Sequence, residues 1–400
     1  MSTSPQHILQ VVPYFYPAWA YGGIPRLAYG LSRALVRAGL RVTVLTTDVF
    51  DAQQRLDTGS APRHLEGIEV ITLRNLSNRL AYHHQAFLPL GVRAALERLE
   101  QSPPDVIHLH GHRHLLNTVG LRLAKQLWPT RSSLPLVMTP NGTLPAIERK
   151  QGVKAIYDRL LGHAVLDAVS QFIAVSRAEV AQLRQAGISA HRVAVIPNGI
   201  ELEEFEPLPP RGTFRQQFGL EGPLVLYLGK LTPRKGVDHL VASLQHLPSA
   251  VHLVIAGNDM GVEQALREQR ERLGLQARVH FVGLLTGTQR LAALADADVL
   301  AYPSTQEIFG LVPFEGLLAG APVVVSDDCG CGELVQEARA GVLVPYGQPK
   351  ALALALEQLL QDRARGQSMV ARGRAFIRTH FDWSRIVEKT LAVYRLAQQG

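Results

Sequence analysis

Short apolar runs alternate with helix-like segments along almost the whole chain. In the first half the runs cover residues 7–12, 41–46, 68–73, 105–110, 136–139, 172–175 and 193–196. Between them, apolar side chains recur at three- and four-residue spacing in residues 24–38, 91–99, 115–127 and 153–169. Near-continuous apolar runs predict strands that are buried on both faces, and the amphipathic segments are the crossover helices that parallel strands require. The pattern predicts a doubly wound α/β sheet.

A second series of the same kind follows in the other half. Its apolar runs cover residues 224–228, 252–256, 279–282, 299–301, 322–325 and 342–344. A chain of 400 residues is longer than one hydrophobic core usually serves. Between the two series, the turn signal Asn198-Gly199 and the acidic, proline-rich stretch 201–211 predict a hinge. We therefore predict two Rossmann-like domains, residues 1–200 and 201–380, that face a central cleft.

The C-terminal residues 381–400 form a separate segment. Apolar side chains between residues 383 and 396 recur at mostly helical spacing. The expected helix either packs on its own domain or bridges back to the N-terminal domain, and the spacing leaves both arrangements open.

Positive charge is concentrated in the first half of the chain. Residues 1–200 contain 21 Lys+Arg against 12 Asp+Glu, whereas residues 201–400 contain 20 against 22. This excess predicts that the N-terminal domain carries the face that would meet phosphate or anionic lipid, although an Arg-rich soluble surface would give the same excess. Nucleic acid is disfavoured as a partner, since no recognised binding motif accompanies the charge.

The apolar tracts and the cysteines both indicate a cytoplasmic protein. No apolar tract reaches about 18 residues, and the apolar start 7–12 is short and has no basic leader, so neither a membrane span nor a signal peptide is indicated. Cys329 and Cys331 are the two cysteines. They are too close for a useful disulfide and too few for a structural zinc site, which predicts free thiols.

Two carboxylates bracket the expected start of a helix in residues 307–315. Gly310 permits a tight turn, after which the N–H groups of Leu311 and Val312 can point at an anion or at sugar hydroxyls. Each carboxylate can accept hydrogen bonds from two vicinal hydroxyls, so one of Glu307 and Glu315 could hold a sugar and the other a ribose. A solvated Glu307 and a Glu315 favoured only by the helix dipole would give the same pattern.

A basic loop follows the first expected strand of the second domain. Lys230, Arg234 and Lys235 lie within residues 229–236, at the carboxyl edge of that strand, where a diphosphate would sit. A nucleoside diphosphate is a good leaving group, so fixed cations that face its developing charge are what its departure requires. The alternative is a basic loop in water.

A glycine pair follows the first strand and an aromatic loop. Gly22 and Gly23 open the expected helix 24–38, and their lack of side chains permits close approach to a phosphate. The dinucleotide-binding fingerprint is not present, because its third glycine is absent here and after Gly330-Cys331-Gly332. The sequence therefore argues against a dehydrogenase.

Taken together, these segments resemble the retaining glycosyltransferases of family 4, which have the GT-B fold. The resemblance covers nearly the whole chain, and its motifs are Gly22-Gly23 and residues 39–46, 104–110, 175–179, 195–200, 229–236 and 307–315. It implies a metal-independent transferase that uses a nucleotide-diphosphate-sugar as donor and co-substrate and that needs no cofactor.

The resemblance also implies roles for individual residues. Lys230 and Lys235 would bind the donor diphosphate. Glu315 would bind the ribose, and Glu307 would bind the transferred sugar. The glycine pair would approach the phosphates from the other domain. The predicted donor-binding residues are Gly22, Gly23, Lys230, Arg234, Lys235, Gly310, Leu311, Val312 and Glu315, and the predicted catalytic residues are Glu307 and Asn141.

Two positions depart from the family pattern. Lys230 stands where relatives usually have Arg, which keeps the charge but loses the bidentate fork. Asn141 stands where many relatives have a catalytically important His. Asn can bond a donor or acceptor hydroxyl but cannot titrate, which weakens acid-base chemistry at this position.

Two further patterns imitate metal sites. His108, His110, His112 and His114 alternate as a strand would require, but the strand ends at Gly111 and no set of carboxylates accompanies them. Asp296-Ala297-Asp298 imitates a metal-binding DxD motif, but it lies between a helix and a strand, which indicates helix-end polarity. We predict no metal at either place.

The acceptor is expected on the N-terminal domain. A segment there mixes basic and apolar side chains: Arg74, Arg79, His83, His84, Phe87, Leu88, Leu90 and Arg93. Such a segment suits a membrane surface. With Arg149 and Lys150 after the Asn141 loop, it predicts a glycan or a lipid-linked diphosphate-sugar acceptor, as in exopolysaccharide or lipopolysaccharide assembly, and a peripheral location at the inner face of the membrane.

Three other functions fit parts of the sequence. A nucleotide-sugar epimerase shares the two-domain architecture. A retaining glycosidase could use Glu307 and Glu315 as acid and nucleophile, but it has no diphosphate for the basic loop to stabilise. A non-catalytic sugar-binding relative would keep donor binding without turnover. The base, the sugar, the acceptor, the linkage and the oligomeric state cannot be read from the sequence.

Overall fold

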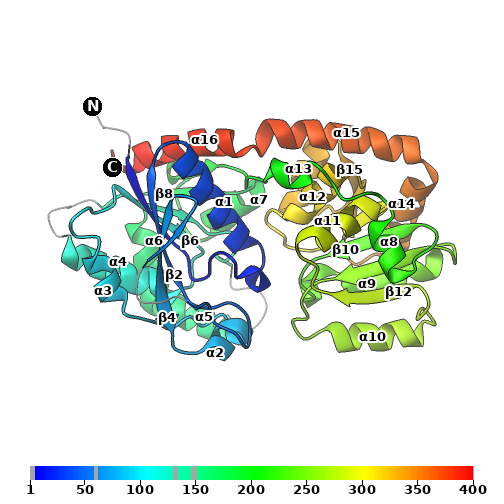
Figure 1. Ribbon diagram of the computed structural model, residues 1–400, viewed down its shortest axis with the longest axis horizontal. Coiled ribbons are helices and arrows are strands. Elements are labelled where there is room, and N and C mark those ends of the chain that lie inside the picture. The colour runs from blue at the N-terminus through cyan, green and yellow to red at the C-terminus, as the bar shows by residue number, and fades with distance from the viewer. Residues whose placement is uncertain (1–4, 58–61, 129–133, 146–150, 400) are drawn as a thin grey trace. The chain divides into compact units, whose positions relative to one another are not determined.

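The computed structural model describes residues 5–57, 62–128, 134–145 and 151–399, which form two compact units (Figure 1). Unit 1 consists of Met1–Gly199 and Trp383–Gly400, and unit 2 of Ile200–Asp382. The chain therefore passes between the units twice. Residues 201–211, predicted as a hinge, belong to unit 2, and Phe205 at the end of the 3-10 turn Leu202–Phe205 is buried.

Unit 1 is built on a mostly parallel sheet. Its strands are β1 (His7–Val11), β2 (Arg41–Thr47), β3 (Arg63–Leu65), β4 (Ile68–Asn75), β5 (Pro89–Leu90), β6 (Val106–His110), β7 (Leu136–Thr139), β8 (Gln171–Ala174) and β9 (Val193–Val195). They follow the order β3-β4-β2-β1-β6-β7-β8-β9, with β5 paired to β4. Only β3 and β5 are antiparallel to their neighbour among the described pairs. These two were not predicted, because neither contains an apolar run.

Helices cover both faces of this sheet. They are α1 (Gly23–Arg37), α2 (Asn78–His84), α3 (Val92–Glu97), α4 (Leu115–Leu127), α5 (Gln151–Tyr157), α6 (His163–Ala168), α7 (Arg177–Gln185) and α16 (Trp383–Ala397). Alternate residues of β1 enter two separate apolar clusters, Leu9 with α3, α4 and α6, and Ile8 with α1 and α16. Both faces of β1 are therefore covered, which explains why its apolar side chains do not alternate with exposed polar ones.

The C-terminal helix α16 packs on unit 1. Figure 1 shows it, in red, beside α1 at the other end of the chain, and Tyr394 is fully buried between the elements of this cluster. Trp383 lies against two glycines: a Cβ on Gly30 would come within 2.3 Å of its ring, and one on Gly199 within 2.4 Å. Of the two arrangements that the spacing leaves open, the structure has the one on the N-terminal domain.

The helix predicted for residues 153–169 occurs, whereas a further helix of unit 1 was not predicted. A π-helical turn, Asp158–Gly162, joins α5 to α6 without a break in the helical backbone. Helix α7 was not predicted, because Leu183 is its one fully buried apolar side chain and the rest of the helix is largely polar.

Unit 2 contains a six-stranded parallel sheet. Its strands are β10 (Leu224–Leu228), β11 (His252–Ala256), β12 (Val279–Gly283), β13 (Val299–Tyr302), β14 (Val323–Ser326) and β15 (Gly341–Val344). Their order is β12-β11-β10-β13-β14-β15. The sheet therefore grows in one direction from β10 to β12 and in the other from β13 to β15, which makes β10 and β13 the topological switch point where ligands of such sheets bind.

The helices of unit 2 cover its sheet and carry the loops described below. They are α8 (Thr213–Phe218), α9 (Val237–Ser243), α10 (Glu263–Arg272), α11 (Gly287–Asp296), α12 (Leu311–Ala319), α13 (Gly330–Glu337), α14 (Pro349–Gln361) and α15 (Arg363–His380). No helix in the described part of the chain is both long and apolar enough to cross a membrane.

Candidate active site

The two predicted donor segments of unit 2 meet at its switch point. The basic loop follows β10 and residues 307–310 follow β13, and these two strands are hydrogen-bonded neighbours. Because the strands are parallel, both loops leave at the same carboxyl edge. The fold thus brings together two segments that are about 70 residues apart in the sequence, as expected for a site at a switch point.

Lys235 lies at the end of the 3-10 turn Pro233–Lys235 and is buried. Its Nζ donates to the Tyr302 hydroxyl at 2.6 Å, forms an ion pair with Glu307 and lies 4.7 Å from the centre of the Tyr302 ring. Gly236 after it has a φ of 62°, and a Cβ there would come 2.2 Å from the carbonyl of Pro303. The glycine is therefore required for the basic loop to lie against the β13 loop.

Glu307 is the anionic partner in this cluster. Its Oε2 accepts from the Tyr302 hydroxyl at 3.1 Å as well as from Lys235. Burial alone would raise the pKa of Glu307, but the cations of Lys235 and Arg234 and the two hydrogen bonds lower it below its ordinary value. Glu307 is therefore a half-buried carboxylate that stays charged, and its contacts with Lys235 and Tyr302 argue against a Glu307 that is only solvated.

The other two cations belong to the same loop. Lys230 directly follows Gly229 and is half-buried, and its carbonyl accepts from the Tyr227 hydroxyl at 3.0 Å. Arg234 is joined to the β13 loop through its carbonyl, which accepts from Thr305 N–H at 2.8 Å. The basic loop is therefore held to the fold on both sides.

Gly310 forms the N-cap of α12, with a φ of 67°. A Cβ at this position would lie 3.1 Å from the Tyr302 ring and 3.2 Å from Glu307, so only glycine fits easily. Leu311 and Val312 are the first two residues of the helix, where backbone N–H groups have no intrahelical acceptor. The helix starts before Glu315, which therefore lies in its second turn.

Glu315 has a partner that the sequence pattern does not reveal. Its Oε1 is 2.8 Å from Nη1 of the buried Arg290 on α11, and Nη2 of Arg290 is 2.6 Å from Glu204. Burial alone would lower the pKa of Arg290, but the two carboxylates raise it. In the sequence, the signal that could have indicated this partner is a lone arginine before the apolar run 291–295.

In unit 1, Gly22 and Gly23 lie where α1 begins. Gly22 has a φ of 100°, which favours glycine, and Gly23 is the first helical residue. The aromatic loop before them is part of the core: the rings of Tyr14 and Tyr21 stack with centroids 4.8 Å apart, and both are buried. Gly23 is exposed, whereas Tyr14 and Tyr21 of the aromatic loop are not available to a ligand.

Asn141 lies in a turn directly after β7. Its Nδ2 donates to the Thr139 carbonyl at 3.2 Å, while its Oδ1 is buried and accepts no hydrogen bond from the described residues. With His110 and Trp383 it borders a cavity of about 30 Å³ in unit 1. Arg149 and Lys150, the predicted acceptor-binding cations, lie outside the described residues.

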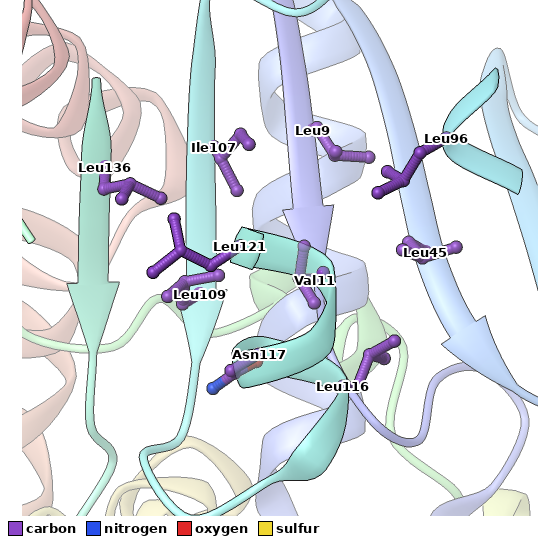
Figure 2. Close-up of a pocket in the computed structure, with 11 residues that line it drawn as sticks. Leu9, Val11, Leu45, Leu96, Ile107, Leu109, Leu116, Asn117, Leu121 and Leu136 are labelled. Carbon is purple, nitrogen blue, oxygen red and sulfur yellow. The ribbon is translucent and has the colours of Figure 1, made fainter. Parts of the chain in front are cut away.

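A second cavity in unit 1 does not qualify as a site. Figure 2 shows it inside the core, lined almost entirely by aliphatic side chains, with Asn117 as the single polar one. Its volume of about 10 Å³ holds at most one water molecule. It is a packing defect, since ligand pockets measure hundreds of Å³.

The alternating histidines are separate core residues. His108 bonds the Tyr394 hydroxyl at 2.8 Å, His110 bonds Gln10 at 2.7 Å, and His112 pairs with Asp158 at 3.2 Å. Burial lowers the pKa of His110 to about 4 and that of His114 to about 3. Within the described residues, no group of three His, Cys, Asp or Glu side chains could hold a metal.

The Asp296-Ala297-Asp298 motif has a structural role. The Asp296 carboxylate accepts from the N–H groups of Phe214 at 2.8 Å and Arg215 at 3.0 Å, at the start of α8. Asp298 accepts from Leu224 N–H at 2.9 Å and pairs with Arg215 at 2.6 Å. The motif therefore caps a neighbouring helix and holds the start of β10.

Two protein-family models match the chain. The model of Glycosyltransferase Family 4 matches residues 21–204, and that of Glycosyl transferases group 1 matches residues 211–376. A D-inositol 3-phosphate glycosyltransferase of Xylanimonas cellulosilytica is 32% identical over 398 residues, which cover 94% of this chain and 92% of that protein. The chain belongs to glycosyltransferase family 4. A further relative of the transferase is the glycogen synthase of Mycobacterium tuberculosis, 30% identical over 98% of the transferase and 95% of the synthase.

Solved structures confirm the predicted GT-B fold of the transferase. HepE of Anabaena, in complex with UDP and glucose, has a TM-score of 0.73 at 22% identity, over 96% of the transferase and 98% of HepE. Sucrose-phosphate synthase of Thermosynechococcus elongatus has a TM-score of 0.75 at 24% identity, over 98% of each chain. Since the relatives are named as transferases and synthases, the epimerase alternative is not favoured.

Proposed function

We propose that this transferase moves a hexose from a nucleotide-diphosphate-sugar to a glycan or lipid-linked acceptor in the synthesis of a cell-surface polysaccharide. The observation that carries the proposal is the cluster of Lys235, Glu307 and Tyr302 at the switch point of unit 2, beside Lys230 and Arg234. It combines cations for a diphosphate with a charged carboxylate for sugar hydroxyls. HepE, which has the same fold, is named in complex with UDP-glucose.

In the proposed mechanism, the cations stabilise the charge that develops on the departing nucleoside diphosphate. Lys235 is already paired with Glu307, so a bound phosphate would share or displace that contact, which couples diphosphate binding to the carboxylate that faces the sugar. The leaving phosphate takes the acceptor's proton on the same face, with retention at the anomeric carbon. A β-linked product from an α-linked donor would contradict retention.

The remaining residues have supporting roles in this proposal. Glu315 binds the ribose with its carboxylate, of which Oε1 is the oxygen nearest to Arg290, and the N–H groups of Leu311 and Val312 approach the donor at the helix N-terminus. Gly22 and Gly23 approach the phosphates from unit 1. Asn141 bonds a hydroxyl of the donor sugar or the acceptor.

A thermal-shift screen tests the donor. UDP-, GDP-, ADP- and TDP-sugars are compared with the matching nucleoside monophosphates, which lack the diphosphate. We expect one diphosphate series to raise the unfolding temperature, since a ligand at 100 times its Kd stabilises the fold by about 2.7 kcal/mol. If no nucleotide sugar stabilises the protein more than its monophosphate does, the donor assignment is wrong.

Chelation tests the proposed absence of a metal. Because protein cations take the place of a divalent ion at the diphosphate, we expect EDTA to change the rate of transfer by less than about twofold. A loss of activity in EDTA that Mg²⁺ or Mn²⁺ restores would contradict this part of the proposal.

The proposed acceptor side of unit 1 has exposed apolar residues next to basic ones. Leu80 on α2 is 41% exposed and Leu90 48%, and both lie near the exposed Arg79 and Arg93 in the sequence. Phe87, predicted for this surface, is instead buried against Tyr14. The mixture of apolar and cationic side chains supports the proposal of a membrane surface as partner.

A second exposed apolar pair lies on α5 and the π-helical turn after it. Ile156 is 62% and Leu160 68% exposed, next to the exposed Arg159. His114 connects the two segments: the centroids of the His114 and Phe87 rings lie 5.6 Å apart, and the His114 carbonyl accepts from the Tyr157 hydroxyl at 3.1 Å. We propose that both face the same membrane surface.

Vesicle binding tests this proposal. We expect the protein to partition onto vesicles containing phosphatidylglycerol at low salt, and Leu80→Glu with Ile156→Glu to weaken partitioning by at least about tenfold, since apolar burial is lost and negative charge is added. Leu354→Glu, at a leucine that is 57% exposed in unit 2, is the matched control and should change nothing. Equal binding by both variants, or no binding by the parent, would contradict the proposal.

A further inference from the structure

Glu179 is a buried carboxylate of unit 1 with no role in the function proposed above. It lies in the first turn of α7 and is fully buried. One of its oxygens accepts from Gly142 N–H at 2.6 Å and the other from Val175 N–H at 2.9 Å. Its own N–H donates to the Ser176 hydroxyl, which caps the helix, at 3.3 Å. Glu179 therefore joins the start of α7 to the turn that follows β7.

That turn carries Asn141. Asn141 and Gly142 have φ values of 53° and 74°, and Thr143 N–H donates back to the Pro140 carbonyl at 3.2 Å. Two central residues with positive φ are the mark of a type I′ turn, which Asn-Gly favours. The far end of the turn is held by Thr143, whose hydroxyl accepts from His112 N–H at 2.7 Å.

The near end of the turn depends on Glu179. Without Glu179, the part-buried Gly142 N–H would lose its acceptor, and leaving such a donor unpaired costs up to about 3 kcal/mol. The Asn141 amide, one residue away, has a buried Oδ1 with no hydrogen bond from the described residues, at the rim of the 30 Å³ cavity. The position of that oxygen is therefore set by the backbone of the turn.

We propose that Glu179 is a positioning residue, whose carboxylate fastens the turn of residues 140–143 to α7 and so holds the Asn141 amide in place for its substrate hydroxyl. This inference rests on the proposed function, in which Asn141 contacts the donor sugar or the acceptor. The N–H groups of Gly142 and Val175 come from different loops, and the Glu179 carboxylate that accepts from both fixes the distance between these loops.

The geometry requires the charged form, because two N–H donors need two acceptor oxygens. Burial raises the pKa of Glu179 to about 7, although the bonds from Val175 and Gly142 act to lower it. Protonation turns one oxygen into a donor and breaks one of the two bonds. The other charged groups at this turn act through Thr143: Arg113 donates to its carbonyl, and both His112 and Arg113 pair with Asp158.

Activity and stability should therefore respond to pH in opposite directions. Since the pKa of Glu179 in the folded protein lies above its ordinary value of 4.5, its contribution to stability is complete below pH 4.5 and is lost as pH rises through about 7. Over the same pH interval the carboxylate becomes charged, so that both of its oxygens accept hydrogen bonds and hold the turn. A purely structural residue would make activity follow stability.

The test uses Glu179→Gln, which keeps the size of the side chain but has one acceptor oxygen. We expect kcat to fall by about 10- to 100-fold, as for a misplaced catalytic group, with KM for the donor changed less than about twofold and the rise of kcat near pH 7 abolished. The matched control is Asp296→Asn, which removes another buried carboxylate that binds backbone N–H groups. It should lower the unfolding temperature and leave kcat and its pH profile as in the parent.

A double variant tests whether Glu179 acts through Asn141. In an Asn141→Ala background, Glu179→Gln should lower kcat by less than about twofold. The proposal would be overturned if the fold-decreases in kcat of the two single variants multiplied in the double variant. It would also be overturned if Glu179→Gln had the same kcat as the parent.

Hydrogen exchange separates this inference from the proposed function, because it needs no activity. In the parent protein, the Gly142 amide should be less protected at about pH 6 than at about pH 8 after correction for intrinsic rates, and Glu179→Gln should lose this difference. Protection that is independent of pH would overturn the positioning role. A protein that shows this exchange pattern but transfers no sugar would contradict only the proposed function.

Discussion

Replacing Lys235 by methionine is expected to lower kcat/KM for sugar transfer by about 100- to 1,000-fold and to abolish stabilisation by the donor. Lys235 is the buried cation of its loop and contacts both Glu307 and Tyr302. A donor to a developing negative charge contributes this much when it is fixed in a desolvated site. Steady-state kinetics and thermal shift with the identified nucleotide sugar measure the two effects.

The control must separate lost chemistry from lost folding. Lys235→Met leaves Glu307 as a half-buried charge without its cation, which costs about 3 kcal/mol of stability. The double variant Lys235→Met with Glu307→Gln removes both charges, so we expect it to regain stability but not activity. Lys350→Met, at an exposed lysine of the same unit, should match the parent. If Lys235→Met had the same kcat/KM as the parent, Lys235 would take no part in the reaction.

Glu315→Gln should raise the Kd of the donor by about 10- to 100-fold. In the proposed function the Glu315 carboxylate binds the ribose, and a hydrogen bond from a hydroxyl to a charged group contributes about 1.5–3 kcal/mol. Stability should also fall, because the buried Arg290 keeps only Glu204 as its partner. Titration calorimetry with the donor and thermal unfolding measure the two quantities.

Glu204→Gln is the matched control for Glu315. Both carboxylates pair with Arg290, at 2.6 Å for Glu204 and 2.8 Å for Glu315, but only Glu315 is proposed to touch the donor. We expect Glu204→Gln to lower the unfolding temperature and to change the donor Kd by less than about twofold. Equal increases in Kd from both variants would mean that Glu315 acts on the donor only by holding Arg290.

The elements that were predictable are those with a continuous apolar signal. The seven strands expected in residues 1–200 and the six expected in residues 201–400 all occur, and the side chains of the central ones are buried on both faces of a sheet. Elements with few apolar residues carry weaker patterns, as β3, β5 and α7 show. The π-helical turn within residues 153–169 also leaves no trace in the spacing of apolar residues.

The contacts within the site were not predictable from its motifs. The sequence places Lys235 and Glu307 in two loops and suggests separate partners for them, a diphosphate and a sugar. Only the neighbouring positions of β10 and β13 bring the two side chains into one ion pair. Arg290 and Glu179 were missed for a similar reason, since each acts through residues that are distant in the chain or through backbone N–H groups.

The basic loop and the carboxylate pair can be recognised from the sequence, because residue type and position after an apolar strand are local properties of the chain. Each of them could also have been solvated surface. The sequence by itself determined two parallel α/β sheets, the family and the segments that carry the chemistry. The tertiary structure decided which charges are buried, which side chains pair and that α16 returns to unit 1, because desolvation and hydrogen bonding depend on neighbours that only the folded chain supplies.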